Sequence, residues 1–143
     1  MTTPPVIYPV ILPVPVAARG LAPRERVRFL SRHAREALRR SAGRLGIELD
    51  PLQKDARWAP LPFQGHFWSL THKPDYVGAV LAPSPVGLDL EPPRPCSPAL
   101  LRRTASEEEW ALVGGGGRDT FFFRYWTAKE AVLKTGGEGI KDL

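Results

Sequence analysis

Asp89 and Glu91 are carboxylates two residues apart, and leucines alternate with them along residues 86–91. On a β-strand, residues two apart face the same way, so a strand here would present both carboxylates on one face. Paired carboxylates repel each other unless a cation lies between them, and magnesium usually binds one or two carboxylates together with phosphate oxygens. The spacing therefore suits a magnesium site, although a solvated pair at a strand end would have the same sequence.

A second charged pair lies on the helix predicted over residues 118–135. At about 100° per residue, Glu130 and Lys134 lie beside an apolar stripe that contains Phe122 and Trp126. An i,i+4 Glu–Lys pair can stabilise its own helix and cover the core. The same two residues could instead supply a third carboxylate for the metal and a cation for phosphate oxygens, and the local pattern leaves both interpretations open.

His72 ends a short apolar segment that begins at Phe67, and it is followed by the turn residues Lys73, Pro74 and Asp75. A histidine in this place can be an ordinary turn residue. It can also donate a hydrogen bond to a phosphate, and local sequence does not decide between the two.

In this order, the segments resemble the 4′-phosphopantetheinyl transferases, specifically the larger class in which related α/β halves lie in one chain with the site between them. The family pattern Gly-hydrophobic-Asp-hydrophobic-Glu matches residues 87–91. The pattern Trp-Ser/Thr-x-Lys-Glu-Ala-x-x-Lys matches residues 126–134, and Gly-x-Gly matches residues 137–139. Residues 69–72, Ser-Leu-Thr-His, resemble the family's Ser-Leu-Ser-His strand. The likeness covers roughly half of the chain, and Lys73 departs from it because a small polar residue is commoner there.

The resemblance implies a transferase, a holo-[acyl-carrier-protein] synthase. The phosphopantetheine arm of coenzyme A would move to a serine of an acyl or peptidyl carrier protein, with release of adenosine 3′,5′-bisphosphate. Asp89, Glu91 and Glu130 would hold Mg²⁺, which neutralises charge on the pyrophosphate. Glu130 would also take the serine proton, and Lys134 would stabilise the pyrophosphate.

The resemblance also implies contacts with coenzyme A as a substrate. His72 would contact a coenzyme phosphate, and Lys129 is a second candidate for the work of Lys134. Family members carry basic residues in the first half that meet the 3′-phosphate, and Arg39 and Arg40 precede the first matched strand at about the right place.

Several elements must position these residues. A proline-interrupted edge strand is expected over residues 6–16, and a helix is expected from Pro23 until Gly43 and Gly46. Val27 begins the apolar stripe of that helix. Strands over residues 67–70 and 76–81 should form a hairpin.

The remaining elements follow a proline-rich connector over residues 92–98. A third strand is expected over residues 86–91. Ser106 and Glu109 form a capping box for a helix that runs to about residue 113. Residues 114–117 should be a flexible tip, and glycines 136 and 137 should end the helix over residues 118–135.

The fold class expected is therefore α+β and 4′-phosphopantetheinyl transferase-like, with one α/β half plus an incomplete second half. Residues 1–85 would form the first half, with the edge strand, the arginine-rich helix and the hairpin. Residues 86–143 would form part of the second half, with the metal-site strand and the helix that contains residues 126–134. The family continues past Gly139 with further strands, so we expect a C-terminally truncated chain. Exposed apolar surface would then favour self-association.

Charge is concentrated in one segment. The net charge is +5, but residues 17–44 contain nine arginines against Glu25 and Glu36, a local balance of +7. A phosphate-bearing or acidic partner is one explanation, and a solvated helix face is the other. Because carrier proteins tend to be acidic, the resemblance favours a carrier protein or coenzyme A over nucleic acid.

Composition excludes other classes. The single cysteine, Cys96, excludes a disulfide framework within the chain and a multi-cysteine zinc site. The apolar stretch over residues 6–18 has no preceding basic residue and is interrupted by prolines, so we expect a cytoplasmic protein with no membrane partner.

The apparent truncation leaves alternatives open. The chain could be an active transferase that completes itself by oligomerising. It could also be an inactive relative that acts as a binding module for acidic carrier proteins.

Overall fold

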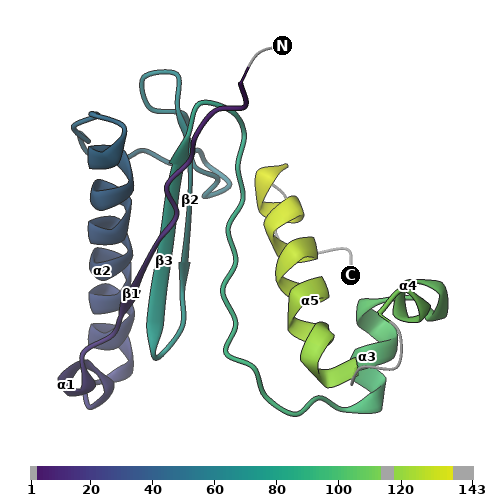
Figure 1. The fold of residues 1–143 in the computed structure, drawn as a ribbon. Coiled ribbons are helices and arrows are strands. Elements are labelled where there is room, and N and C mark those ends of the chain that lie inside the picture. The colour runs from purple at the N-terminus through teal and green to yellow at the C-terminus, as the bar shows by residue number, and fades with distance from the viewer. Residues whose placement is uncertain (1–2, 114–117, 137–143) are drawn as a thin grey trace.

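A three-stranded antiparallel sheet forms the centre of the computed structural model, which describes residues 3–113 and 118–136 (Figure 1). The strand order is β1 (Val10–Pro13), β3 (Tyr76–Ala82) and β2 (Phe67–His72). In the register, Ala79 of β3 lies opposite Val10 on one side and Leu70 on the other. The predicted hairpin is therefore confirmed.

Successive side chains of β3 point to opposite sides of the sheet, so the two faces carry different residues. Val77, Ala79 and Leu81 are buried in the cluster that also contains the apolar residues of α2 (Pro23–Arg44). Gly78 points the other way, since a Cβ atom on it would lie 3.3 Å from the side chain of Leu88. Helix α2 thus covers one face, and the chain that follows the hairpin covers the other (Figure 1).

Helix α2 begins with proline at its first turn, where no backbone donor is lost. Its buried residues are Leu30, Ala34, Ala37, Leu38, Ser41 and Ala42. Ser41 is the one hydroxyl among them, and its Oγ accepts a hydrogen bond of 3.0 Å from the backbone N–H of Leu81. The predicted helix is confirmed, but Val27 is 56% exposed, so its assignment to the core stripe was wrong. The buried face of the helix begins at Leu30 and continues through the small residues of the later turns.

The predicted edge strand is shorter than expected. Only Val10–Pro13 pairs with β3, and a short helix, α1 (Val16–Arg19), follows at once. The prolines at positions 9, 13 and 15 explain the short strand, because a proline cannot donate to a ladder.

A second cluster of helices follows the proline-rich connector. These are α3 (Pro98–Thr104), α4 (Glu107–Ala111) and α5 (Arg118–Thr135). The capping box of Ser106 and Glu109 is confirmed at the start of α4. Helix α3 was not predicted, although Ser97 caps it with a side-chain hydrogen bond and Pro98 opens it. The small core of this cluster of helices contains Trp110, Phe122 and Phe123.

The expected third strand over residues 86–91 is wrong. The segment is extended, but the backbone–backbone hydrogen bonds of the described residues join it to no strand. Side chains take their place: Leu88 donates its N–H to Ser69 Oγ at 3.0 Å, and Lys134 Nζ donates to the Leu88 carbonyl at 2.9 Å. A Cβ atom on Gly87 would lie 1.8 Å from the Ala131 carbonyl oxygen, so the segment packs directly against α5.

The mixed helices and antiparallel sheet confirm an α+β fold, whereas its division into two halves stays a prediction. The predicted flexible tip over residues 114–117, the helix stop at Gly137 and the motif over residues 137–139 lie outside the described residues. Helix α5 ends at Thr135, as expected. None of the helices in residues 3–113 and 118–136 is both long and apolar enough to cross a membrane.

Candidate active site

A cleft of about 270 Å³ opens where the end of β2, the extended segment over residues 86–91 and α5 come together. Nine residues line it: Leu70, Thr71, His72, Lys73, Asp89, Glu91, Trp126, Glu130 and Lys134. Three motifs that are far apart in the sequence therefore meet at one place. Five of the predicted site residues are among them: His72, Asp89, Glu91, Glu130 and Lys134.

Asp89 lies deep in the cleft, with a side chain only 5% exposed. Its Oδ1 accepts hydrogen bonds from Lys134 Nζ at 3.1 Å and from Thr71 Oγ1 at 3.3 Å. Its Oδ2 is buried and has no hydrogen-bond partner. One oxygen of the carboxylate is thus held by hydrogen bonds. The other has no partner, and we call such an oxygen open because it is available to a ligand.

Glu130 is the second buried carboxylate, at 3% exposed. Its Oε1 also has no hydrogen-bond partner. Burial raises the pKa of Glu130, and the negative charge of Asp89 raises it further, while the ammonium groups of Lys134 and Lys73 act in the opposite direction. The carboxyl therefore holds a proton more readily than an ordinary glutamate does.

Lys134 reaches away from its own helix to the Leu88 carbonyl and the Asp89 carboxylate. The local ion pair with Glu130 that the sequence allowed is absent from the ion pairs of the described residues. Lys134 instead ties α5 to the extended segment that carries the other carboxylates.

Glu91 differs from the other two carboxylates because both of its oxygens face cations. Its Oε1 is paired with Lys73 Nζ, and its Oε2 lies 3.9 Å from a guanidinium nitrogen of Arg94. Its side chain is only 8% exposed.

His72 stands at the mouth of the cleft. Partial burial lowers the pKa of His72, and the charges of Lys134, Lys73 and Lys54 lower it further. The imidazole is therefore neutral at neutral pH, with one N–H to donate.

Lys129 does not line this cleft. Its ammonium donates to the Thr104 carbonyl at 2.7 Å and pairs with Glu109 at 3.0 Å. It thus joins α5 to the start of α4.

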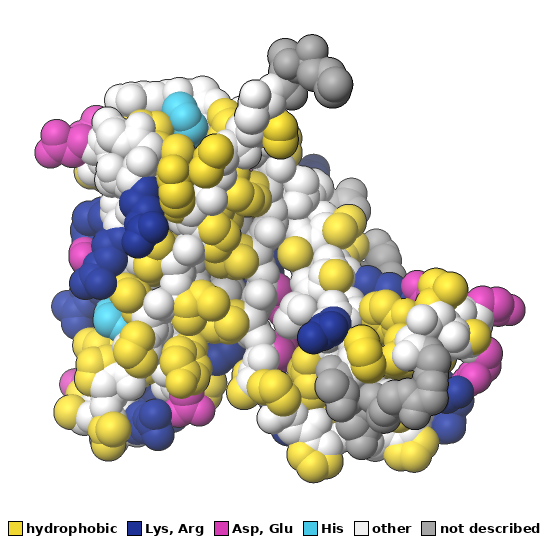
Figure 2. Space-filling model, viewed as in Figure 1, with side chains coloured by type: hydrophobic (Ala, Val, Ile, Leu, Met, Phe, Trp, Pro, Cys, Tyr) yellow, Lys and Arg dark blue, Asp and Glu magenta, His cyan; other side chains and the backbone are white. Residues whose placement is uncertain are grey.

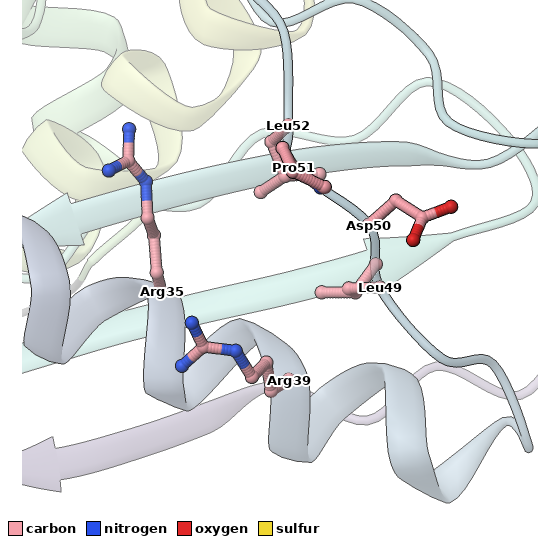
Figure 3. A pocket seen from close by; sticks show the side chains of 6 residues that line it. All are labelled: Arg35, Arg39, Leu49, Asp50, Pro51 and Leu52. Atoms are coloured by element: carbon pink, nitrogen blue, oxygen red, sulfur yellow. The ribbon is translucent and has the colours of Figure 1, made fainter.

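Arg39 and Arg40 lie on α2, across the sheet from the cleft, and both pair with Glu36. Arg39 and Arg35 line a separate cleft of about 370 Å³, in which they stand opposite the loop over residues 49–52 (Figure 3). Figure 2 shows Lys and Arg side chains gathered along the side of the molecule that α2 forms.

Thr71 and Lys73 contact the candidate carboxylates but were not proposed from the sequence as site residues. The sequence feature that could have indicated them is their position on either side of His72, at the end of the motif over residues 69–72.

The fit of these residues to magnesium rests on the two open carboxylate oxygens. Asp89 Oδ2 and Glu130 Oε1 are buried, unpartnered and on residues that line one cleft. Hard oxygen donors of this kind suit Mg²⁺, for which one or two carboxylates are the usual protein ligands. Within the described part of the chain, no group of three His, Cys, Asp or Glu residues is arranged to hold a metal ion.

Comparison with known proteins agrees with the motifs. Residues 85–143 match the family model of the 4′-phosphopantetheinyl transferase superfamily. The 4′-phosphopantetheinyl transferase psf-1 of Bacillus pumilus is 33% identical over 78 residues, which cover 52% of this chain and 33% of the relative. The 4′-phosphopantetheinyl transferase HetI of Nostoc sp. (strain PCC 7120) is 33% identical over 114 residues, which cover 71% of this chain and 48% of the relative.

The matches thus span less than half of the length of either relative. The matched residues 85–143 contain Asp89, Glu91, Glu130 and Lys134, the cleft residues that the extended segment and α5 supply. Through this segment, the chain is similar to the 4′-phosphopantetheinyl transferase superfamily.

Proposed function

We propose that the protein transfers the 4′-phosphopantetheine group of coenzyme A to a serine of an acyl or peptidyl carrier protein, with release of adenosine 3′,5′-bisphosphate. The observation that carries the proposal is the meeting of Asp89, Glu91, Glu130 and Lys134 in one cleft, although they come from motifs far apart in the sequence. The match of residues 85–143 to the family model supports the same reaction class.

Asp89 and Glu130 would hold magnesium through their open oxygens, with Glu91, the third carboxylate of the motifs, beside them. When bound, the ion would neutralise charge on the pyrophosphate of coenzyme A. Lys134 holds Asp89 in place and brings a positive charge for the phosphate oxygens.

Glu130 is the candidate general base. In the metal-free cleft burial raises its pKa, and a carboxylate with a raised pKa is a better proton acceptor than an ordinary glutamate. It would take the proton of the serine hydroxyl, directly or through water. His72, neutral and at the mouth of the cleft, would donate a hydrogen bond to a coenzyme phosphate.

The carrier serine would attack the phosphorus atom that bears the pantetheine arm. A new P–O bond forms to serine, the bond to the bridging oxygen of the pyrophosphate breaks, and adenosine 3′,5′-bisphosphate leaves with that oxygen. Lys134 would stabilise the charge that develops on the leaving phosphate.

A mass assay tests this proposal. The purified chain, coenzyme A, Mg²⁺ and an apo carrier protein should yield a carrier that is heavier by one phosphopantetheine group. Asp89→Ala and Glu130→Ala should abolish transfer without changing the circular dichroism spectrum. Glu48→Ala removes an exposed carboxylate outside the cleft, so this control should keep wild-type transfer. Transfer that persists in Asp89→Ala or Glu130→Ala would refute the roles given to these carboxylates.

The basic face of α2 favours a second function, the binding of acidic carrier proteins. Arg24, Arg28, Arg32, Arg35 and Arg39 are exposed and recur at helical spacing. Their place across the sheet from the cleft suits a docking surface better than contacts with the coenzyme. Carrier binding without transfer would support this function and refute the enzyme.

A further inference from the structure

Glu91 forms an ion pair with the ammonium group of Lys73. Lys73, in the turn between β2 and β3, pairs with Glu91 although 18 residues separate them in the chain. The Lys73 backbone N–H also donates to the Tyr76 carbonyl at 2.8 Å, which fixes the turn that carries the ammonium. The Lys73 side chain is 29% exposed and that of Glu91 is 8% exposed, so the pair is largely shielded from water.

The other two carboxylates of the cleft are in a different state. Each keeps one buried oxygen with no partner. A carboxylate that is already paired with an ammonium is less available to a metal ion, and the ammonium itself repels a divalent cation. The three carboxylates of the motif are therefore not equivalent.

We propose that Lys73, a second cation of this cleft beside Lys134, holds Glu91 away from the metal and sets the affinity for magnesium. The inference rests on the proposed function. Asp89 and Glu130 then supply the protein ligands for the ion, and Lys73 acts as a positioning residue through Glu91.

The apolar surroundings strengthen the pair. Lys73 and Glu91 also line a second groove of about 290 Å³, together with Asp75 and the largely apolar residues Ile11, Tyr76, Leu90 and prolines 92 and 93. The pair thus forms part of the wall between this groove and the cleft. Apolar walls lower the local dielectric constant, and this increases the attraction between the ammonium and the carboxylate.

The test measures the affinity for Mg²⁺ alone by isothermal titration calorimetry, with no coenzyme or carrier protein present. Lys73→Gln removes the charge and keeps a hydrogen-bond donor for Glu91. It should tighten Mg²⁺ binding about tenfold, the scale of the repulsion between a unit charge and a divalent ion several ångströms apart in water. Lys73→Arg keeps the charge and should bind Mg²⁺ as the wild type does. Lys54→Gln removes a nearby lysine charge outside the carboxylate cluster and should change the affinity less than twofold.

The double variant Lys73→Gln/Glu91→Gln identifies the metal ligands. It removes both charges of the pair, so its Mg²⁺ affinity should equal that of the wild type if Glu91 does not ligate the ion. An affinity well below the wild-type value would overturn the proposal, because Glu91 would then be a ligand. Should Lys73→Gln fail to fold, as judged by circular dichroism, the double variant is compared with Glu91→Gln. Loss of the Lys73 charge should then tighten Mg²⁺ binding about tenfold, and equal affinities of these two variants would overturn the proposal.

Two further results would also overturn the inference: equal affinities of the wild type and Lys73→Gln, or no binding of Mg²⁺ by any variant. The transfer assay separates this failure from that of the proposed function. Transfer by a wild type whose Mg²⁺ affinity is insensitive to Lys73 would refute the inference and leave the enzyme standing.

Discussion

Glu130 combines two properties that conflict in a folded protein, since it is 3% exposed and has one oxygen without a hydrogen-bond partner. Burying a charge without full pairing costs stability. A site that binds a cation or accepts a proton gains from the same feature, because the open oxygen is ready for either. The buried carboxylate thus lowers the stability of the fold and serves the chemistry of the site.

Glu130→Gln is expected to raise the free energy of unfolding of the metal-free protein by about 1 kcal/mol, because a neutral amide is cheaper to bury than a carboxylate. The pKa of Glu130 is raised in the folded state. The stability that its protonated form contributes is therefore fully present below the unfolded pKa and is lost as the pH rises through the folded pKa. The advantage of the glutamine variant should grow over that range.

Urea unfolding in EDTA across this pH range measures the effect. Glu48→Gln, which removes an exposed carboxylate outside the cleft, is the control. A Glu130→Gln variant that is less stable than the wild type at every pH would contradict the account of Glu130 as an unpaired buried charge.

Among the elements, those defined by local patterns were predicted well. The hairpin depends on turn residues next to each other, and the helices α2 and α5 depend on apolar residues at helical spacing. Residues 86–91 were predicted wrongly as a strand, because alternation indicates an extended chain whether or not a neighbour pairs with it. The side chains that hold this segment, Ser69 and Lys134, lie 19 and 46 residues away from Leu88.

Gly87→Ala should show how closely the extended segment packs on α5. The new Cβ atom would lie 1.8 Å from a backbone oxygen of Ala131, so the segment must move, at a cost of about 1–3 kcal/mol. Gly43→Ala is the matched control, because no atom lies within 4 Å of its Cβ position and alanine favours a helix by about 0.5–1 kcal/mol. Thermal unfolding should rank Gly43→Ala above the wild type and Gly87→Ala below it, and the reverse order would contradict the packing.

The capping box predicts an acid-sensitive helix start. The Ser106 backbone N–H and the Lys129 ammonium lower the pKa of Glu109. The stability that this carboxylate contributes is present above its unfolded pKa and is lost as the pH falls through the folded pKa. Glu109→Gln should therefore be less stable than the wild type at neutral pH, and the difference should shrink in acid, as followed by circular dichroism. A difference that is constant with pH would contradict the ionic part of the cap.

For the molecule as a whole, the sheet separates a basic face from an acidic cleft. The arginine stripe of α2 was visible in the sequence, because five arginines recur at helical spacing. Its place across the sheet from Asp89 and Glu130 was not visible, because it depends on which face of the sheet each later segment covers. The pairing of Lys73 with Glu91 escaped prediction for the same reason.

The two faces predict separate effects on carrier binding and on chemistry. Arg28→Glu/Arg32→Glu should weaken the binding of an apo carrier protein and reduce its dependence on salt, because exposed arginines act through screened charge. At a saturating carrier concentration, turnover should stay within about twofold of the wild type, since neither residue contacts the cleft. Equal loss of turnover at all carrier concentrations would contradict this separation.

The extended segment over residues 86–91 also has a consequence for local opening. Strand β3 is paired on both sides, whereas the segment is held by side-chain contacts and by its packing on the α5 backbone. The side chains that hold it are those of Ser69, Thr71, Lys73 and Lys134. Such contacts can break without unfolding the sheet, so its amides should exchange with deuterium faster than those of β3. Mg²⁺ should slow this exchange if it binds Asp89 and Glu130 together, because it would then join the segment to α5. The cleft would thus become fully ordered only when its ligand binds.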